Sequence, residues 1–296
     1  MAGTTDPGVL FVHAHPDDEC INNGASMAMY VAQGRRVTLV TCTRGEEGEV
    51  LVPALERLAA QHDDELGAHR ETELAAAMEI LGVTDHRFLG GPGRYRDSGM
   101  MDEPTNARPD CFWQADVDEA AAYLVEILRE VRPGAVATYD DNGGYGHPDH
   151  IQTHRVTMRA VELAADPAFR PDLGAAWDVP KVYENVIPRS FLQQGIDAMK
   201  EAGVDFFGTE NVEDLPFGVP DEMATAKVDA TDFEPQKMKA LAAHATQVEV
   251  DGPFFALSNH VGSRAWGYEF YRLVRGESAE PYDEDGRETS LLNGLL

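Results

Sequence analysis

The sequence predicts an α/β protein with a mostly parallel, Rossmann-like sheet covered by helices on both faces, completed by a smaller C-terminal α+β part. Three observations lead to this prediction. Apolar, strand-like runs alternate with amphipathic helical segments through the first half of the chain. Two of the runs end in clusters of acidic and imidazole side chains, each directly before a helix. Beyond residue 187 the alternation weakens, and one further helix is clear.

The individual elements follow from local composition and periodicity. Runs rich in β-branched and other apolar residues predict buried strands, and apolar residues recurring every three to four positions predict helices. Glycine directly after a helical segment, as at Gly34 and Gly82, marks its end. The expected strands are 9–13, 36–42, 86–90, 134–140 and 181–187. The expected helices are 21–33, 64–81, 116–131, 148–165 and 235–247.

Composition excludes several classes of function. The 296 residues include 24 Lys and Arg against 52 Asp and Glu, a formal net charge of −28. Such a field repels phosphate backbones and anionic lipids, so neither nucleic acid nor a membrane surface is an expected partner. The three cysteines, Cys20, Cys42 and Cys111, form no CxxC pair and fit reduced thiols. With no signal peptide or membrane-spanning run apparent, we expect a cytoplasmic protein that acts on a small molecule, and we predict no oligomeric state.

The first polar cluster, "HAHPDDE", directly follows the strand 9–13. Pro16 suits the first turn of a helix, and the carboxylates after it suit the positive end of the helix dipole. An acidic helix start is therefore one interpretation of this stretch. It does not account for His15, which stands at the end of the strand.

A metal site is the second interpretation of the same cluster. His15 and Asp18 stand three positions apart and can reach one point across a turn, whereas Asp17 must point elsewhere. Asp17 could then act on a water bound by the other two. An imidazole with a carboxylate suits zinc or ferrous iron better than magnesium or calcium. We interpret His13, on the same strand face as His15, as a core or supporting histidine.

The second polar cluster, "YDDNGGYGHPDH" at 139–150, follows the strand 134–140. His147, His150 and His154 share one face of the helix that begins here, and each could bind a metal. We choose His150 as the ligand, because His154 lies one turn (about 5.4 Å) deeper along the helix and is expected in the core. His147 either faces a pocket or caps the helix. Tyr145, in the glycine-rich loop, is either a lid residue or a hydrogen-bond donor.

The two clusters are expected to meet, because ligands bind at the carboxyl ends of the strands in open parallel sheets. Structural zinc usually has cysteine ligands, which neither cluster supplies, so the pattern indicates a catalytic site. Three protein ligands leave a position for water, whose pKa falls toward ~7 on a metal. The matching chemistry is hydrolysis through a tetrahedral intermediate. Asp17 would deprotonate the water, and the metal with His147 or Tyr145 would stabilise the oxyanion.

Two further residues are candidates for the pocket. Arg70 lies in the middle of the apolar face of the helix 64–81. A buried charge needs a partner, so Arg70 either extends to the surface or points into a polar cavity, and we favour the cavity. Asp97 lies in the polar loop "GRYRDSGM" at 93–100, where it could bind sugar hydroxyls. An ordinary surface loop is the simpler interpretation of that stretch taken alone.

At "AHPDDE" and "GHPDH" the chain resembles the PIG-L/LmbE-like metal-dependent N-deacetylases, whose hallmarks are (A)HPDD and HxxH. The stretches "TCTRGEEGEV" at 41–50, "GRYRDSGM" and "KALAAHATQV" at 239–248 extend the resemblance along most of the chain. Residues 165–235 carry no matching motif. Within the family, these stretches look like the branch that removes acetate from N-acetylglucosaminyl-inositol in mycothiol biosynthesis.

The resemblance implies roles for particular residues. It implies a zinc or ferrous centre on His15, Asp18 and His150, with Asp17 as general base. It implies His147 as an electrostatic or acid catalyst and Tyr145 as an oxyanion or lid group. The substrate-binding residues that it implies are Arg70, Asp97, Glu49 and Asn259, the last two more weakly. The segment 171–180 is the expected seam in the chain pattern, so we expect residues 1–175 to form the metal-binding catalytic core and 176–296 to complete the pocket, either as two parts or as one continuous domain.

Three other functions compete with this one. A mycothiol S-conjugate amidase would share the glucosaminyl-inositol part of the substrate but accept a larger acyl group; the loop 93–100 favours the deacetylase. Another N-acetyl-sugar deacetylase, acting for example on chito-oligosaccharides, is more distant. A non-catalytic sugar- or nucleotide-binding module is disfavoured, because no GxGxxG follows the first strand and such a module has no need of Asp17 beside a ligand set.

Overall fold

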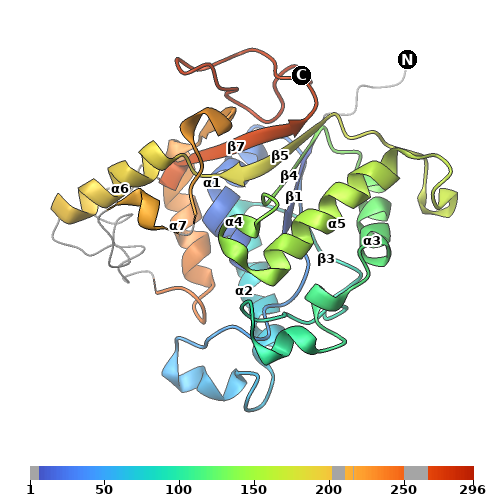
Figure 1. The fold of residues 1–296 in the computed structure, drawn as a ribbon, viewed down its shortest axis with the longest axis vertical. Helices are drawn as coiled ribbons and strands as arrows, with labels where there is room; N and C mark the ends of the chain where they lie inside the picture. Colours follow the sequence, from blue (N-terminus) through green and yellow to red (C-terminus); the bar gives the residue numbers. More distant parts are fainter. Residues whose placement is uncertain (1–6, 202–210, 216, 250–265) are drawn as a thin grey trace.

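The computed structural model describes residues 7–201, 211–215, 217–249 and 266–296 (Figure 1). Seven strands of this part form one sheet in the order β3-β2-β1-β4-β5-β7-β6. The first five strands of that order are mutually parallel, β7 runs antiparallel to β5, and β6 runs antiparallel to β7. The predicted fold class, a mostly parallel α/β sheet with a smaller α+β part at its C-terminal side, is confirmed.

The elements have the following bounds. The strands are β1 (Val9–His13), β2 (Val37–Thr41), β3 (Asp85–Phe88), β4 (Ala135–Thr138), β5 (Lys181–Val186), β6 (Ala226–Asp229) and β7 (Tyr268–Arg275). The helices are α1 (Asp18–Ala32), α2 (Leu66–Leu81), α3 (Val117–Val131), α4 (Gly143–Gly146), α5 (Pro148–Ala165), α6 (Arg189–Glu201) and α7 (Glu234–Ala243). Of the helices described, none is both long enough and apolar enough to cross a lipid bilayer.

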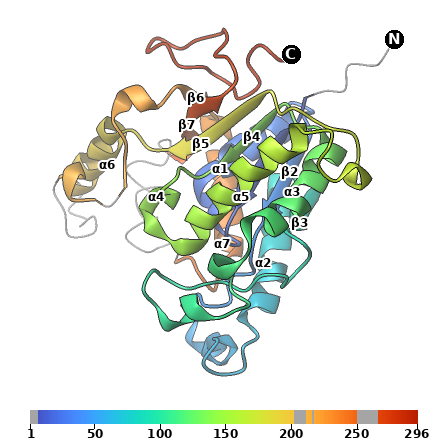
Figure 2. The ribbon, with the colours of Figure 1, turned by 45° about the vertical axis from the view of Figure 1, so that its right-hand side comes forward.

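The sheet is covered on both faces (Figures 1 and 2). Helices α1, α2 and α7 pack on one face, where they enclose a core that includes Val9 and Phe11 of β1. Helices α3 and α5 pack on the other face, against Leu10 and Val12 of the same strand. Because both faces are buried, the strand is apolar at successive positions rather than at alternate ones.

The centre of the sheet determines where a ligand can bind. From β1 the chain proceeds to β2 on one side, and it returns later to β4 on the other side, with Val9 of β1 opposite Ala135 of β4. This reversal of direction leaves a crevice at the carboxyl ends of β1 and β4, the usual position of ligands in open parallel sheets. The two polar clusters of the sequence follow these two strands.

Two helix boundaries differ by three or more residues from those expected. Helix α1 begins at Asp18 instead of residue 21, and α7 ends at Ala243 instead of residue 247. The apolar periodicity begins only at Ile21, but the carbonyl of Asp17 already accepts the N–H groups of Cys20 (2.9 Å) and Ile21 (3.0 Å). Carboxylates in the first turn favour this early start through the helix dipole, an effect that apolar periodicity does not register.

Four elements were not expected from the sequence: α4, α6, β6 and β7. Strand β7 contains three charged residues, which weaken its resemblance to a buried strand. Each of them finds a partner distant in sequence: Glu269 binds Lys237 (2.8 Å), Arg272 binds Glu184, and Arg275 binds Asp178 (2.7 Å). These pairings are long-range and therefore cannot be seen in local sequence.

The C-terminal segment is attached to the sheet by buried polar contacts. Lys181 Nζ lies 2.6 Å from Glu288 Oε1, and the hydroxyl of Tyr183 donates to Glu288 Oε2 at 2.8 Å. All three residues are buried. The single sheet therefore contains strands from both sides of residue 176, and Glu288 ties the last residues of the chain to β5.

We predict that Tyr183→Phe lowers the free energy of unfolding by about 1–3 kcal/mol, because it leaves one oxygen of a buried carboxylate without a hydrogen bond. Urea denaturation followed by circular dichroism measures this change. Tyr282→Phe is the matched control, since Tyr282 is 44% exposed and its loss should cost less than about 0.5 kcal/mol. Equal stability of the two variants would contradict the importance of this contact.

Candidate active site

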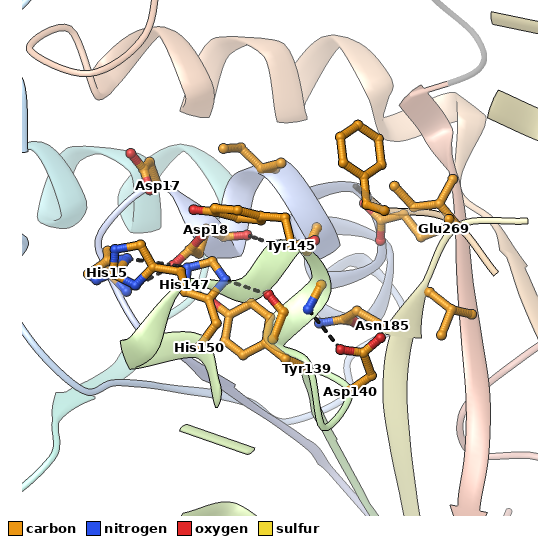
Figure 3. Close-up of a pocket in the computed structure, with 18 of the residues that line it drawn as sticks. His15, Asp17, Asp18, Tyr139, Asp140, Tyr145, His147, His150, Asn185 and Glu269 are labelled. Carbon is orange, nitrogen blue, oxygen red and sulfur yellow. Dashed lines mark hydrogen bonds and ion pairs between the residues drawn. The ribbon is translucent and has the colours of Figure 1, made fainter. Parts of the chain in front are cut away.

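A cavity of about 820 Å³ opens at the carboxyl ends of β1 and β4 (Figure 3). It is lined by loops that follow these strands and, on the far side, by α6 and β7. Every predicted site residue in the described part of the chain lines it: His15, Asp17, Asp18, Glu49, Arg70, Asp97, Tyr145, His147 and His150. Asn259 lies outside the described residues.

The turn after β1 separates the two neighbouring aspartates. Asp18 Oδ2 accepts the backbone N–H of His15 at 2.9 Å and lies 3.3 Å from Nδ1 of the same histidine. Asp17 has a φ of 109°, which sends its side chain in another direction, toward Arg70 at 3.1 Å. The carboxylate of Asp18 is thus directed at His15, whereas the carboxylate of Asp17 is paired with Arg70.

His150 brings the second cluster to the same place. It lies in the first turn of α5, with Nδ1 3.1 Å from the carbonyl of Gly143 and Nε2 3.4 Å from Asp18 Oδ2. Gly143 has a φ of +65°, and a Cβ there would lie 2.5 Å from that of His150, so this close approach requires glycine. Because Nδ1–H donates to the carbonyl, Nε2 of the neutral ring carries a lone pair; Nε2 is buried and has no hydrogen-bond partner among the described residues.

Within the set His15, Asp18 and His150, the two separations that involve Asp18 fit a divalent metal. Ligand atoms about 2.0–2.1 Å from a tetrahedral ion are about 3.3 Å apart, close to the 3.3 Å and 3.4 Å that separate Asp18 Oδ2 from the two imidazoles. The other ring nitrogen of His15, Nε2, lies 3.2 Å from Asp149 Oδ2. A carboxylate on the far nitrogen is the usual support for a metal-binding histidine.

Around His15, the groupings whose ligand atoms all lie within 4.8 Å of one another are His15 with His147 and His150, and His15 with Asp97 and Asp149. His147 Nδ1 accepts the backbone N–H of Asp149 at 3.1 Å, so a neutral His147 carries its proton on Nε2. In that state it is a hydrogen-bond donor and not a metal ligand. Asp97 and Asp149 both face Nε2 of His15, on the side away from Asp18.

Burial and charge set the protonation of the site. Burial, partly offset by Arg70, raises the pKa of Asp17 to about 6. Burial also raises the pKa of Asp18, but His150 and His15 outweigh it and hold the pKa well below its usual range. Burial, together with the neighbouring His15 and His150, lowers the pKa of His147 to about 3. Near neutral pH, Asp18 is therefore ionised and His147 is a neutral imidazole.

Arg70 points into the protein, as favoured from its helix face. It is 3% exposed, and its guanidinium donates to the carbonyls of Gly45 (2.9 Å) and Pro16 and to Asp17 Oδ2 (3.1 Å). Gly45 has a φ of +74°, and a Cβ there would lie 2.0 Å from Arg70 Nη1. The glycine in "TRGEEGEV" therefore allows the arginine to reach the turn that carries Asp17.

The other predicted pocket residues differ in their surroundings. Asp97 is buried and accepts the N–H groups of Gly99 (2.9 Å) and Glu47 (3.2 Å), with Oδ1 3.5 Å from His15 Nε2. Glu49 is exposed at the rim of the cavity. Tyr145 is 44% exposed, and its ring lies edge-on to that of His150 with the ring centres 5.1 Å apart. Their roles toward a substrate remain predictions.

Sequence reasoning missed several residues that support the site. Asp149 binds His15 and accepts the N–H of Ser98 at 2.9 Å. Tyr139 stacks on His150 with ring centres 4.2 Å apart, and its hydroxyl accepts the N–H of Ala14. Asp149 stands inside "GHPDH" and Tyr139 directly after the strand, so the sequence places both beside the site. The residues that they contact could not be inferred from the sequence.

Three comparisons place the chain among known proteins. The family model described as "PIG-L: GlcNAc-PI de-N-acetylase" matches residues 10–161, more than half of the chain. A relative from Geodermatophilus obscurus, named 1D-myo-inositol 2-acetamido-2-deoxy-alpha-D-glucopyranoside deacetylase, is 62% identical over 289 residues, which cover 97% of each chain. A relative of the same name from Streptomyces avermitilis is 56% identical, covering 100% of this chain and 99% of the relative.

Similarity to solved structures is more distant and concerns the fold. The N,N'-diacetylchitobiose deacetylase from Pyrococcus horikoshii matches with a TM-score of 0.61 at 21% identity. The match covers 91% of this chain and 84% of that one. The two proteins therefore share the arrangement of sheet and helices that positions the cavity.

We predict that Asp149→Asn weakens the binding of a divalent metal, with zinc as the probe, by about 10- to 100-fold. The amide keeps an oxygen for His15 Nε2 and the Ser98 N–H but carries no negative charge, so it supports the imidazole of His15 less strongly than the carboxylate does. Competition with a fluorescent chelator measures the dissociation constant. Asp172→Asn, at an exposed carboxylate paired with Arg170, is the control. An unchanged dissociation constant in Asp149→Asn would rule out the supporting role.

Proposed function

The chain belongs to the PIG-L family of de-N-acetylases, and we propose that it hydrolyses the acetamide of N-acetylglucosaminyl-inositol, giving glucosaminyl-inositol and acetate for mycothiol biosynthesis. The observation that carries this proposal is the nearly full-length match to relatives named for that deacetylation. The cavity supports it independently, because it combines a fitting set of metal ligands with a carboxylate and a neutral imidazole that are not needed as ligands.

We assign a zinc ion, with ferrous iron as the alternative, to His15, Asp18 and His150. Two imidazoles and one carboxylate suit these ions, and three protein ligands are typical of catalytic sites. When bound, the metal supplies a Lewis acid and lowers the pKa of a coordinated water toward ~7. The lone pair of His150 Nε2, which is buried without a partner in the described part of the chain, supports this assignment.

Asp17 acts as the general base. It lies next to the ligand Asp18 but is directed elsewhere, and its side chain is partly exposed to the cavity. Its raised pKa, about 6, makes it a stronger base than an ordinary carboxylate. Asp17 removes a proton from the attacking water and returns it to the departing amine nitrogen, so that one proton is carried from water to the leaving group.

His147 stabilises the oxygen of the acetamide carbonyl as it becomes negative. Its neutral ring holds a proton on Nε2, because Nδ1 accepts the N–H of Asp149 at the start of α5. A fixed donor of this kind favours the tetrahedral intermediate without a protonation step. Tyr145, exposed on the one-turn helix α4 beside His150, adds its hydroxyl or closes over the bound sugar.

Substrate hydroxyls bind to the polar rim of the cavity. We assign Arg70, Asp97 and Glu49 to the sugar and inositol, and Asn259 keeps the same expected role outside the described residues. Residues after 176 complete the pocket through α6 and β7. We further propose that the reaction takes place in the cytoplasm, which is supported by the three free, buried cysteines.

One feature of the cavity favours a second activity, the cleavage of mycothiol S-conjugates. Its far wall is apolar and includes Phe191, Leu192 and Ala198 of α6 with Phe270 of β7. Neither acetate nor inositol needs apolar surface of this kind, whereas a larger acyl group could bury part of itself there. The amidase is therefore the alternative to be tested beside the deacetylase.

We predict that the zinc-loaded protein releases acetate from N-acetylglucosaminyl-inositol, and that removing the metal with a chelator abolishes this activity. Amine formation, detected with fluorescamine, measures the rate. Adding zinc back should restore it. Persistence of full activity after complete metal removal would eliminate the metal mechanism.

The same assay distinguishes the two substrates. The acetylated pseudodisaccharide should be hydrolysed with a higher kcat/KM than a bimane conjugate of mycothiol. A higher value for the conjugate would make the amidase the main activity.

We predict that Asp17→Asn lowers kcat by about 10²- to 10⁴-fold while metal content stays at one ion per chain, because the amide cannot accept the proton of the water. Metal content is measured by inductively coupled plasma mass spectrometry on the dialysed protein. Asp172→Asn again serves as the control and should keep full activity. Retained kcat in Asp17→Asn would show that another group is the base.

A further inference from the structure

The stretch "KALAAHATQV" at 239–248 has no part in the proposed chemistry, yet His244 within it connects to the turn that carries Asp17. His244 follows the last residue of α7 and is fully buried. Its Nε2 lies 2.8 Å from Glu19 Oε1, although the two residues are 225 positions apart. Helix α7 therefore places an imidazole against the first turn of α1.

Glu19 links His244 to Asp17. While Oε1 binds His244, the second oxygen, Oε2, accepts the backbone N–H of Asp17 at 2.9 Å. The thiol of Cys20 also donates to Oε1, at 3.0 Å. Glu19 is fully buried, so this carboxylate depends on its hydrogen-bond partners for its charge.

The cluster of Glu19, Cys20 and His244 does not have the geometry of a metal site. Ligand atoms of these residues lie within 4.8 Å of one another. The 2.8 Å between Glu19 and His244 is a charge-assisted hydrogen bond, shorter than the roughly 3.3 Å expected between two ligands of a tetrahedral ion. Nε2 of His244 and Oε1 of Glu19 thus satisfy each other, while Nδ1 of His244 is buried without a hydrogen-bond partner among the described residues.

Asp17 needs such support, because its backbone adopts a conformation that residues with side chains disfavour. Its φ is 109° and its ψ is −35°. Strained backbone of this kind persists at functional sites only where the surroundings hold it in place. Two residues hold this turn. Arg70 donates to the carbonyl of Pro16 and to the Asp17 side chain, and Glu19 accepts the Asp17 N–H.

We propose that Glu19 and His244 form a positioning pair, which fixes the backbone of Asp17 so that its carboxylate stays aimed at the attacking water. The inference rests on the proposed role of Asp17 as general base. Neither member of the pair touches substrate in this scheme. Both act through the Asp17 N–H.

The residues after His244 extend the same support to neighbouring segments. Thr246 donates through its N–H (2.8 Å) and hydroxyl (2.7 Å) to Glu73, one turn from Arg70 on α2. Gln247 donates to the carbonyl of Glu49 at 2.9 Å, at the rim of the cavity. The segment 244–247 thus contacts Glu19 beside the turn that carries Asp17, helix α2 that carries Arg70, and the rim of the cavity at Glu49.

The test compares zinc-loaded, full-length variants on N-acetylglucosaminyl-inositol. The double variant Glu19→Met/His244→Leu replaces the buried pair by apolar side chains of similar size, an exchange that folded proteins often tolerate. We expect kcat to fall about 10- to 100-fold with KM and zinc content unchanged, because the base is misplaced and nothing else is lost. Tyr183→Phe, which loses a buried hydrogen bond far from the site, should keep its kcat.

Conservative replacement separates positioning from packing. In His244→Gln the amide nitrogen can still donate to Glu19, so kcat should stay within about threefold of the original protein. In His244→Met, similar in size but without a donor, kcat should fall as in the double variant. This second pair of variants carries the test if the double variant does not fold.

Nuclear magnetic resonance gives a readout that does not depend on turnover. The Asp17 amide proton, bonded to a carboxylate, should exchange slowly with solvent in the original protein and faster in the double variant. Unchanged exchange together with unchanged kcat would overturn the inference.

Asp17→Asn in the same assays separates the two proposals. If Asp17→Asn loses activity and the double variant does not, only the positioning role fails. If Asp17→Asn keeps its activity, the role of the base fails, and the positioning role falls with it.

Discussion

The site depends on one short turn, in which two neighbouring aspartates are sent in different directions. The φ of 109° at Asp17 separates its carboxylate from that of Asp18, so one faces the imidazoles and the other faces Arg70. Asp18 is then the common neighbour of His15, in the turn after β1, and His150, in the first turn of α5. Without this separation both carboxylates would compete for one position, and neither a ligand nor a separate base would result.

The fold allows this turn because β1 and β4 are adjacent and parallel at the centre of the sheet. Parallel pairing brings the ends of both strands to one edge, where the loop after β4 delivers His150 opposite His15. Tyr139, the first residue after β4, joins the two ends directly through its stacking on His150 and its bond to the N–H of Ala14. The sheet therefore determines the distance between the imidazoles, and the turn determines which oxygen lies between them.

Much of this arrangement could be predicted from the sequence, because its signals are local. The runs that become β1, β2 and β4, and the motifs that carry His15 and His150, are continuous in the chain. Strand β7 and the contact of Glu19 with His244 could not be predicted, because their charges are neutralised by partners far away in sequence. A buried carboxylate looks the same in sequence as an exposed one, and only the fold supplies the group that binds it.

The buried carboxylates around this turn give a physical reason for a cation at the site. Five buried or nearly buried carboxylates gather around the turn: Asp17, Asp18, Glu19, Asp97 and Asp149. Arg70 offsets one of them, while imidazoles and backbone N–H groups stabilise the others by hydrogen bonds. Removing so many negative charges from water is costly unless positive charge accompanies them. A divalent ion on Asp18 would supply that charge beside His15 and His150, so the proposed metal would offset the cost of burying these carboxylates.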